Sequence, residues 1–162
     1  MTDELLEVRA GKLLTAHGLT LSTAESCTGG LLINRLTDIS GSSAYIMVGV
    51  VTYSNDAKMS LLNVRLQTII DYGAVSEQTA AEMATGARKQ FNTNVGLSVT
   101  GIAGPTGGTP TKPIGLTYIG LSADTLPSER IIRRVWNGDR AQNKQYSADA
   151  ALRLLIEYLE EL

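Results

Sequence analysis

The spacing of apolar residues predicts a chain that alternates between helices and strands. Apolar positions recur at intervals of three or four residues in segments that we expect to be helical: 3–17, 28–39, short pieces within 55–72, 77–91, and a last helix whose stripe runs over 148–159. Apolar runs bounded by glycine, proline or polar residues predict strands at 19–25, 45–53, 94–100, 114–123 and 129–136. This order favours an α/β fold, a three-layer α/β/α sandwich with a mixed, mainly parallel sheet of about five strands. We expect residues 1–162 to form a single domain.

Individual residues predict where helices begin and end and which strands are buried or lie at an edge of the sheet. Gly18 is expected to end the first helix, and Ser76 and Asp139 are expected to cap the helices that follow them. The segment 45–53 carries little polarity, which predicts a strand buried on both faces of the sheet. The segment 129–136 carries three arginines, which predicts an edge strand because charge discourages pairing with another strand.

Composition narrows the class of protein and its compartment. The 162 residues carry 14 basic and 16 acidic side chains and a net charge of −2, so no basic face for nucleic acid is expected. The single cysteine, Cys27, rules out an intrachain disulfide and fits a reducing compartment. The acidic start, Met1-Thr2-Asp3-Glu4, is unlike a signal peptide, and no apolar run approaches the roughly 20 residues of a membrane helix. We therefore expect a cytoplasmic protein without a nucleic-acid or membrane partner.

The segment Ala24–Gly30, which reads Ala-Glu-Ser-Cys-Thr-Gly-Gly, is the strongest candidate for chemistry. It joins a predicted strand to a predicted helix, which places Ser26 on a sharp turn. Gly29 and Gly30 would let a ligand approach the backbone, and the N–H groups at the helix N-terminus suit an oxyanion or a phosphate. The turn is therefore interpreted as a nucleophile elbow, an anion-binding cradle, or both.

A serine nucleophile needs a base, and the sequence favours Lys58 for that role. The only histidine, His17, precedes the first strand, whereas Ser26 follows that strand. Lys58 follows the second predicted strand, and a parallel neighbour would bring it to the same carboxyl edge, where open α/β sheets bind ligands. A Ser–Lys pair is a known variant of the catalytic triad. Its lysine must be neutral, which requires burial or nearby positive charge.

Two further segments are expected at the same edge of the sheet. The third strand ends in the glycine-rich turn Thr100–Gly104, whose N–H groups could complete an oxyanion hole or hold a phosphate. Arg140 follows the capping residue of the last helix and could reach an anion. The three segments that carry Ser26, Lys58 and Thr100 each follow a strand and can converge on one edge of the sheet. Their convergence predicts a small-molecule site with an anion cradle and a Ser–Lys nucleophile, but it does not identify the substrate.

Each of these residues also has a purely structural interpretation. Ser26 could be a helix N-cap, Lys58 a solvated lysine, and Glu25 a brace for the turn. Cys27 could be a small buried residue or, because it adjoins Ser26, a rival thiol nucleophile. The remaining candidates could serve in sheet packing, in a routine strand exit or on the surface: Tyr53, Thr100, Gly101 and Arg140.

Taken together, the motifs resemble the CinA C-terminal domain family over almost the whole chain, roughly residues 5–160. The matching segments are Thr23–Gly30, Ser42-Ser43, Val51–Asn55 with Lys58, Gly73–Ser76, Thr100–Pro105, Lys112-Pro113 and Gly138–Arg140. Stand-alone members of this family include nicotinamide mononucleotide deamidases. The resemblance therefore implies hydrolysis of the nicotinamide carboxamide of nicotinamide mononucleotide to nicotinic acid mononucleotide and ammonia, with no metal or organic cofactor.

Carried over by position, the resemblance also implies a role for each candidate residue. Ser26 would be the nucleophile, and Lys58 would be the general base that later protonates the leaving ammonia. Tyr53 and Thr100 would hydrogen-bond within the site and orient this pair. Contacts to the substrate would come from the two turns and the last helix: Glu25, Cys27, Thr28, Gly29, Gly30, Gly101, Ile102, Ala103, Gly104 and Arg140. Which turn binds the phosphate and which binds the oxyanion stays open.

Two positions depart from the family pattern, and one alternative function stays open. Asn63 stands where glycine is expected, although asparagine also tolerates a left-handed turn. Lys144 stands where arginine is more usual, which would lose a bidentate contact if that residue binds phosphate. The alternative function is a non-catalytic nucleotide-binding or regulatory module of this competence- and damage-inducible family. We also expect a homo-oligomer, because small α/β domains with an apolar last helix often associate.

Overall fold

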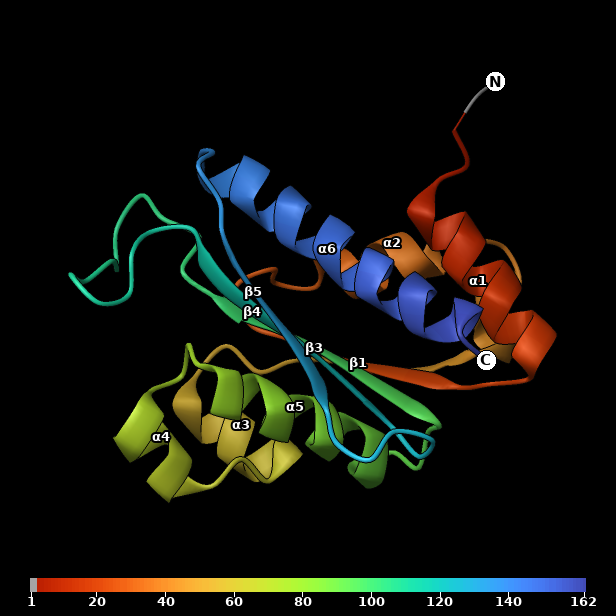
Figure 1. The fold of residues 1–162 in the computed structure, drawn as a ribbon, viewed down its shortest axis with the longest axis horizontal. Coiled ribbons are helices and arrows are strands. Elements are labelled where there is room, and N and C mark those ends of the chain that lie inside the picture. The colour runs from red at the N-terminus through yellow and green to blue at the C-terminus, as the bar shows by residue number, and fades with distance from the viewer. Residues whose placement is uncertain (1–2) are drawn as a thin grey trace.

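The computed structural model describes residues 3–162; Met1 and Thr2, which belong to the acidic start considered above, lie outside the described residues. Five strands form one mixed sheet between two layers of helices (Figure 1). The strands are β1 (Leu21–Glu25), β2 (Ile46–Val51), β3 (Val95–Gly101), β4 (Leu116–Ala123) and β5 (Arg130–Val135). Their order across the sheet is β2-β1-β3-β4-β5, so the predicted three-layer α/β/α fold is confirmed.

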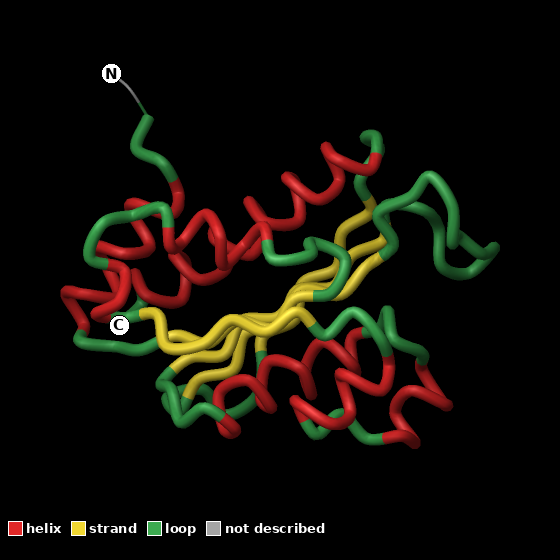
Figure 2. Tube along the Cα trace, turned by 180° about the vertical axis from the view of Figure 1, so that it is seen from behind, coloured by secondary structure: helices red, strands yellow, loops and turns green. Residues whose placement is uncertain are grey.

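The helices divide between the two faces of the sheet. One face is covered by α1 (Leu6–His17), α2 (Leu31–Thr37) and α6 (Arg140–Glu160). The other is covered by α3 (Asn55–Leu62), α4 (Leu66–Tyr72) and α5 (Glu77–Gln90), and the view from behind shows the strands between these layers (Figure 2). A short 3-10 helix, Ser42–Ala44, precedes β2. Within residues 3–162, no helix is both long enough and apolar enough to cross a membrane.

Strand direction determines which chain segments meet at the carboxyl edge. β1 pairs in parallel with β2 and β3, whereas β4 runs antiparallel to both β3 and β5. Glu25 at the end of β1 lies opposite Val51 of β2 and Val99 of β3. The residues that follow these three strands therefore leave the sheet side by side, at the edge where the sequence predicts a site.

The apolar stripe of α6 lies inside the molecule. Its side chains are almost completely buried: Ala148, Ala151, Leu152, Leu155, Ile156 and Leu159. All of these except Ala148 belong to the main hydrophobic core, together with Ala10 and Leu14 of α1. Because this stripe already has its packing partners, it offers no surface to a second chain. The expected homo-oligomer therefore cannot form through this stripe, and the oligomeric state stays a prediction.

The two edge strands differ from each other in their exposure and charge. β5 lies at one edge, as its arginines predict. β2 lies at the other edge, and its residues alternate between partly buried and exposed, with Met47 45% and Val51 43% exposed. The prediction that this strand is buried on both faces is wrong, because β2 has β1 as its only strand neighbour and the helices cover it incompletely.

The predicted helix ends are present where local hydrogen bonding can fix them. Ser76 accepts a hydrogen bond from Thr79 N at 3.1 Å, and Asp139 and Gln142 form a reciprocal capping box at the start of α6. Asn63 adopts the left-handed conformation at the end of α3, with φ 56°, as the glycine expected there would. The helix predicted at 28–39 is confined to α2, because the residues before Leu31 form a turn.

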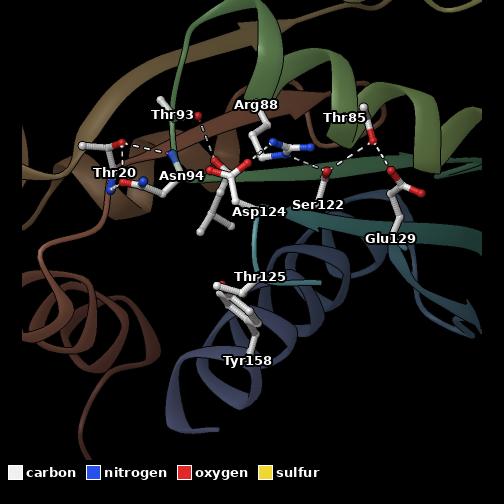
Figure 3. Close-up of polar contacts among 11 residues, drawn as sticks. Thr20, Thr85, Arg88, Thr93, Asn94, Ser122, Asp124, Thr125, Glu129 and Tyr158 are labelled. Carbon is white, nitrogen blue, oxygen red and sulfur yellow. Dashed lines mark hydrogen bonds and ion pairs between the residues drawn. The ribbon is translucent and has the colours of Figure 1, made fainter. Parts of the chain in front are cut away.

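Side-chain hydrogen bonds stabilise the end of the sheet at which β1 and β3 begin, opposite to their carboxyl ends (Figure 3). Asn94 Oδ1 accepts from the N–H group of Thr20 at 2.8 Å, which ties the start of β1 to the start of β3. Arg88 of α5 donates to Ser122 Oγ of β4 at 2.9 Å and pairs with Asp124. These contacts fix the frame of the sheet far from its carboxyl edge.

Candidate active site

Ser26 and Lys58 meet at the carboxyl edge of the sheet. Ser26 directly follows β1, and Lys58 lies in the first turn of α3, whose N-cap Ser54 accepts from Ala57 N at 3.0 Å. Lys58 Nζ lies 3.0 Å from Ser26 Oγ and 2.7 Å from the carbonyl oxygen of Thr52. The structure thus brings together the two residues that parallel β1 and β2 were expected to juxtapose.

The surroundings of Lys58 favour a neutral amine. Its side chain is only 1% exposed, and no carboxylate within residues 3–162 forms an ion pair with it. Burial lowers the pKa of Lys58 from its ordinary value of 10.5, because the charged form loses its hydration. A neutral Lys58 can donate one N–H to Thr52 and use its lone pair to accept the hydroxyl proton of Ser26.

Glu25 is a structural brace for the start of α2. Its carboxylate is fully buried and accepts from Leu32 N at 2.9 Å and from Ile33 N at 3.0 Å. Those N–H groups belong to the first turn of α2, where the sequence predicts that an oxyanion or a phosphate binds. The expectation that Glu25 contacts the substrate is therefore corrected, because its two oxygens already neutralise this helix end.

The nucleophile turn still contains backbone donors. Ser26 N donates to Val99 O at 3.0 Å and is therefore occupied. The N–H groups of Cys27 and Thr28 donate to no acceptor on another residue within 3–162. Thr28 is completely buried and lies outside the pocket, so only the Cys27 N–H is available to an oxyanion beside Ser26 Oγ. Burial raises the pKa of the Cys27 thiol to about 12, which keeps it protonated near neutral pH and argues against a thiol nucleophile.

The second glycine-rich turn packs directly against the first. A Cβ atom at Gly101 would lie 2.7 Å from Thr117 Oγ1 and 3.1 Å from Cys27 Sγ, so only glycine fits there. Ile102 N donates to Leu116 O at 2.8 Å, whereas the N–H groups of Ala103 and Gly104 have no backbone acceptor within the described residues. This turn therefore presents free N–H groups toward the same edge.

Arg140 joins the second turn to the end of β2. Its guanidinium donates to Gly104 O at 2.8 Å and to the Tyr53 hydroxyl at 3.2 Å. Thr100 donates to Ala74 O at 2.8 Å. Neither Tyr53 nor Thr100 forms a hydrogen bond with Ser26 or Lys58. The expectation that these two hydroxyls orient the pair directly is therefore corrected.

These segments enclose a pocket of about 270 Å³. The predicted site residues in its lining are Ser26, Cys27, Tyr53, Lys58, Thr100, Gly101, Ile102, Ala103, Gly104 and Arg140. Thr28, Gly29 and Gly30 lie outside the lining, and the Thr28 side chain is fully buried. The lining residues that the sequence analysis did not select as site residues are Asn55, Ala74, Val75, Thr106 and Gly107. Asn55 could have been predicted as a site residue, because it belongs to the same segment after the second strand as Lys58.

Arg140 gives the pocket a positive charge, because the lining contains no carboxylate and its other basic residue, Lys58, is in an environment that favours the neutral amine. Lys144 lies close by, with its Nζ 3.6 Å from where a Cβ on Gly29 would be. Within residues 3–162, no three His, Cys, Asp or Glu side chains gather as metal ligands would. This arrangement suits an anionic small molecule with a carbonyl group placed beside Ser26.

Comparison with known proteins identifies the family. The model of the CinA C-terminal domain matches residues 3–159. A CinA-like protein of Chloroherpeton thalassium is 48% identical over 160 residues, and this chain spans 38% of the length of that curated relative. A solved CinA superfamily protein from Klebsiella pneumoniae superposes with a TM-score of 0.92 at 32% identity, covering 97% of both chains. The competence/damage inducible protein CihA of Agrobacterium tumefaciens gives a TM-score of 0.87 at 39% identity, covering 99% of this chain and 98% of that chain. The chain belongs to the CinA C-terminal domain family.

Proposed function

We propose that this chain is a nicotinamide-nucleotide amidase, which hydrolyses the carboxamide of nicotinamide mononucleotide to nicotinic acid mononucleotide and ammonia. The contact between Lys58 Nζ and Ser26 Oγ, at 3.0 Å in a buried environment, is the observation that carries the proposal. A buried lysine with no carboxylate partner is costly to a fold, and a binding module gains nothing from that cost. A general base gains the neutral amine that it needs.

The proposed reaction proceeds through an acyl-enzyme. Neutral Lys58 takes the hydroxyl proton as Ser26 Oγ attacks the carboxamide carbon, and the carbonyl oxygen becomes an oxyanion that accepts from the N–H group of Cys27. Protonated Lys58 then donates to the amide nitrogen as the C–N bond breaks and ammonia leaves. Water then attacks the ester carbon while Lys58 accepts a proton from the water. As the ester C–O bond breaks, Lys58 returns this proton to Ser26 Oγ, and nicotinic acid mononucleotide leaves.

The substrate's phosphate fits the second turn better than the first. Glu25 occupies the N-terminus of α2, so a phosphate there would meet a carboxylate. Near the second turn, Arg140 supplies a guanidinium, and Ala103 and Gly104 supply N–H groups without backbone acceptors. We therefore assign the oxyanion to the turn after Ser26 and the phosphate to the turn after β3.

A comparison of three amides tests this proposal. Ammonia release should be measured with nicotinamide, its riboside and its mononucleotide at equal concentrations. The proposal expects efficient turnover of the mononucleotide alone, because only that compound carries the phosphate. Equal turnover of all three would point to a general small-amide hydrolase. Thermal stabilisation by mononucleotides without any ammonia release would favour the non-catalytic regulatory module.

A further inference from the structure

Two peptide units of the second turn are anchored through their carbonyl oxygens. Ile102 O accepts from Gly115 N at 2.7 Å, and Ala103 O accepts from Asn143 Nδ2 at 3.0 Å. The C=O and N–H groups of a trans peptide unit point in opposite directions. Each anchored carbonyl therefore turns the N–H group of its own unit, on Ala103 or on Gly104, away from the anchor. Both of these residues line the pocket.

Asn143, the anchor of the second unit, is a buried polar residue near the start of α6. Its side chain is 2% exposed. Burying an amide group costs free energy unless its hydrogen bonds are made. Both ends of this amide are paired, because Nδ2 donates to Ala103 O and Oδ1 accepts from Gly138 N at 2.9 Å. An apolar side chain at this position would leave a carbonyl and an N–H group without these partners.

The second contact of Asn143 fixes the segment that carries Arg140. Gly138 lies two residues before Arg140, which is the first residue of α6. A Cβ atom on Gly138 would lie 2.7 Å from Gln142 Cβ and 3.0 Å from Asn143 Oδ1, so this close approach needs a glycine. Arg140 in turn donates to Gly104 O at 2.8 Å. One buried amide therefore ties the turn that carries Gly104 to the helix start that carries the guanidinium.

We propose that Asn143 is a positioning residue, which orients the Gly104 N–H group and the Arg140 guanidinium toward the phosphate of the substrate. This inference rests on the proposed binding of a mononucleotide with its phosphate at the second turn. Asn143 lies outside the pocket lining, so it acts through the Ala103–Gly104 peptide and not by touching the ligand. A hydrogen bond to an anion is strong only when its donor is aligned, so loss of the anchor weakens the binding of phosphate.

Variants on neighbouring turns of α6 test this role. Asn143→Leu keeps the approximate shape of the side chain and removes both of its hydrogen bonds. Asn143→Asp retains an acceptor oxygen but, while ionised, cannot donate to Ala103 O. The control is Ser147→Ala, one turn further along, where the side chain is 1% exposed. Ser147 forms hydrogen bonds with Trp136 and Thr117, neither of which lines the pocket.

The affinities of two ligands that differ only in their phosphate are compared. The ligands are nicotinic acid mononucleotide and nicotinic acid riboside, which carry no amide to be hydrolysed. Isothermal titration calorimetry gives the dissociation constants, and circular dichroism verifies folding. Wild type and Ser147→Ala should prefer the mononucleotide. In both Asn143 variants this preference should fall about tenfold or more, because an aligned hydrogen bond to a charged group is lost, whereas binding of the riboside should change little.

Nuclear magnetic resonance of the wild type supplies a measurement that needs no variant. The Gly104 amide proton should move downfield when the mononucleotide binds and should stay in place with the riboside, because only the phosphate accepts from it. This measurement decides the question if the Asn143 variants do not fold. A Gly104 resonance that ignores the phosphate would overturn the proposal.

The outcomes separate this proposal from the amidase. A wild type without preference for the mononucleotide, an unchanged preference in both folded Asn143 variants, or an equal loss in Ser147→Ala would overturn the positioning role, even if the wild type releases ammonia. A wild type that releases no ammonia from nicotinamide mononucleotide, but whose preference for phosphate depends on Asn143, would remove the amidase and support the positioning role.

Discussion

Replacing Glu25 by glutamine tests whether its carboxylate supports the nucleophile turn. Glu25 is fully buried, and its two oxygens accept from Leu32 N at 2.9 Å and from Ile33 N at 3.0 Å. Glutamine keeps the shape of the side chain but offers one acceptor oxygen and one NH₂ group. Glu25→Gln therefore leaves one of the two N–H groups facing another donor, without access to water.

The size of the effect follows from these two contacts. A hydrogen bond to a charged group contributes about 1.5–3 kcal/mol, and a buried unsatisfied donor costs a similar amount, so we expect a total loss of about 2–4 kcal/mol. With a urea slope of about 2 kcal/mol/M, the unfolding midpoint should fall by about 1–2 M. This loss is a large share of the stability of a small domain, which is about 5–15 kcal/mol.

The assay is urea unfolding followed by circular dichroism, with Glu77→Gln as the matched control. Glu77 also lies in the first turn of a helix, α5, but it is exposed and its carboxylate accepts no hydrogen bond from a residue within 3–162. The control should lose about 1 kcal/mol or less, from the helix dipole alone. Equal midpoint shifts for the two variants would refute the role of the Glu25 carboxylate as the brace for the start of α2.

Three further predictions concern the titration of the two buried groups in the site. The rate of ammonia release should rise with pH and reach a plateau, with an apparent pKa below 10.5, because burial lowers the pKa of Lys58. A pH–rate profile whose apparent pKa is 10.5 or higher would contradict this. The unfolded chain binds more protons than the folded chain between the lowered pKa and 10.5, so wild-type stability should rise across that window relative to Lys58→Met. Urea midpoints at several pH values measure this, and a constant difference between the two proteins opposes it. Iodoacetamide near neutral pH should leave the rate of ammonia release unchanged, because the pKa of the Cys27 thiol is about 12 and the residue is buried; progressive inactivation with alkylation of Cys27 would restore the thiol mechanism.

Sequence reasoning succeeded where chain continuity and strand direction decide the outcome. Ser26 and Lys58 follow neighbouring strands, and parallel pairing alone brings such residues to one edge. Ser76 and Asp139 cap their helices through contacts three residues away, which local sequence determines. These relations need no knowledge of how distant segments pack.

Predictions from the sequence were wrong where the contacts of a residue depend on how distant segments of the chain pack together. Glu25 binds the N–H groups of Leu32 and Ile33, and this contact exists only because the intervening turn folds back over the end of β1. The hydroxyl of Thr100 is bound by the carbonyl of Ala74, which comes from the loop before α5. The edge position of β2 depends on the order of the strands, which an apolar run does not reveal.

Ammonia release from nicotinamide mononucleotide, by wild type and Ser26→Ala side by side without added metal, tests the central claim most directly. The account predicts steady release by the wild type and none above background by the variant, which should keep its fold and bind the mononucleotide. Release by both proteins would contradict Ser26 as the nucleophile. Release by neither, together with clear binding of the mononucleotide, would contradict the amidase and leave a binding module.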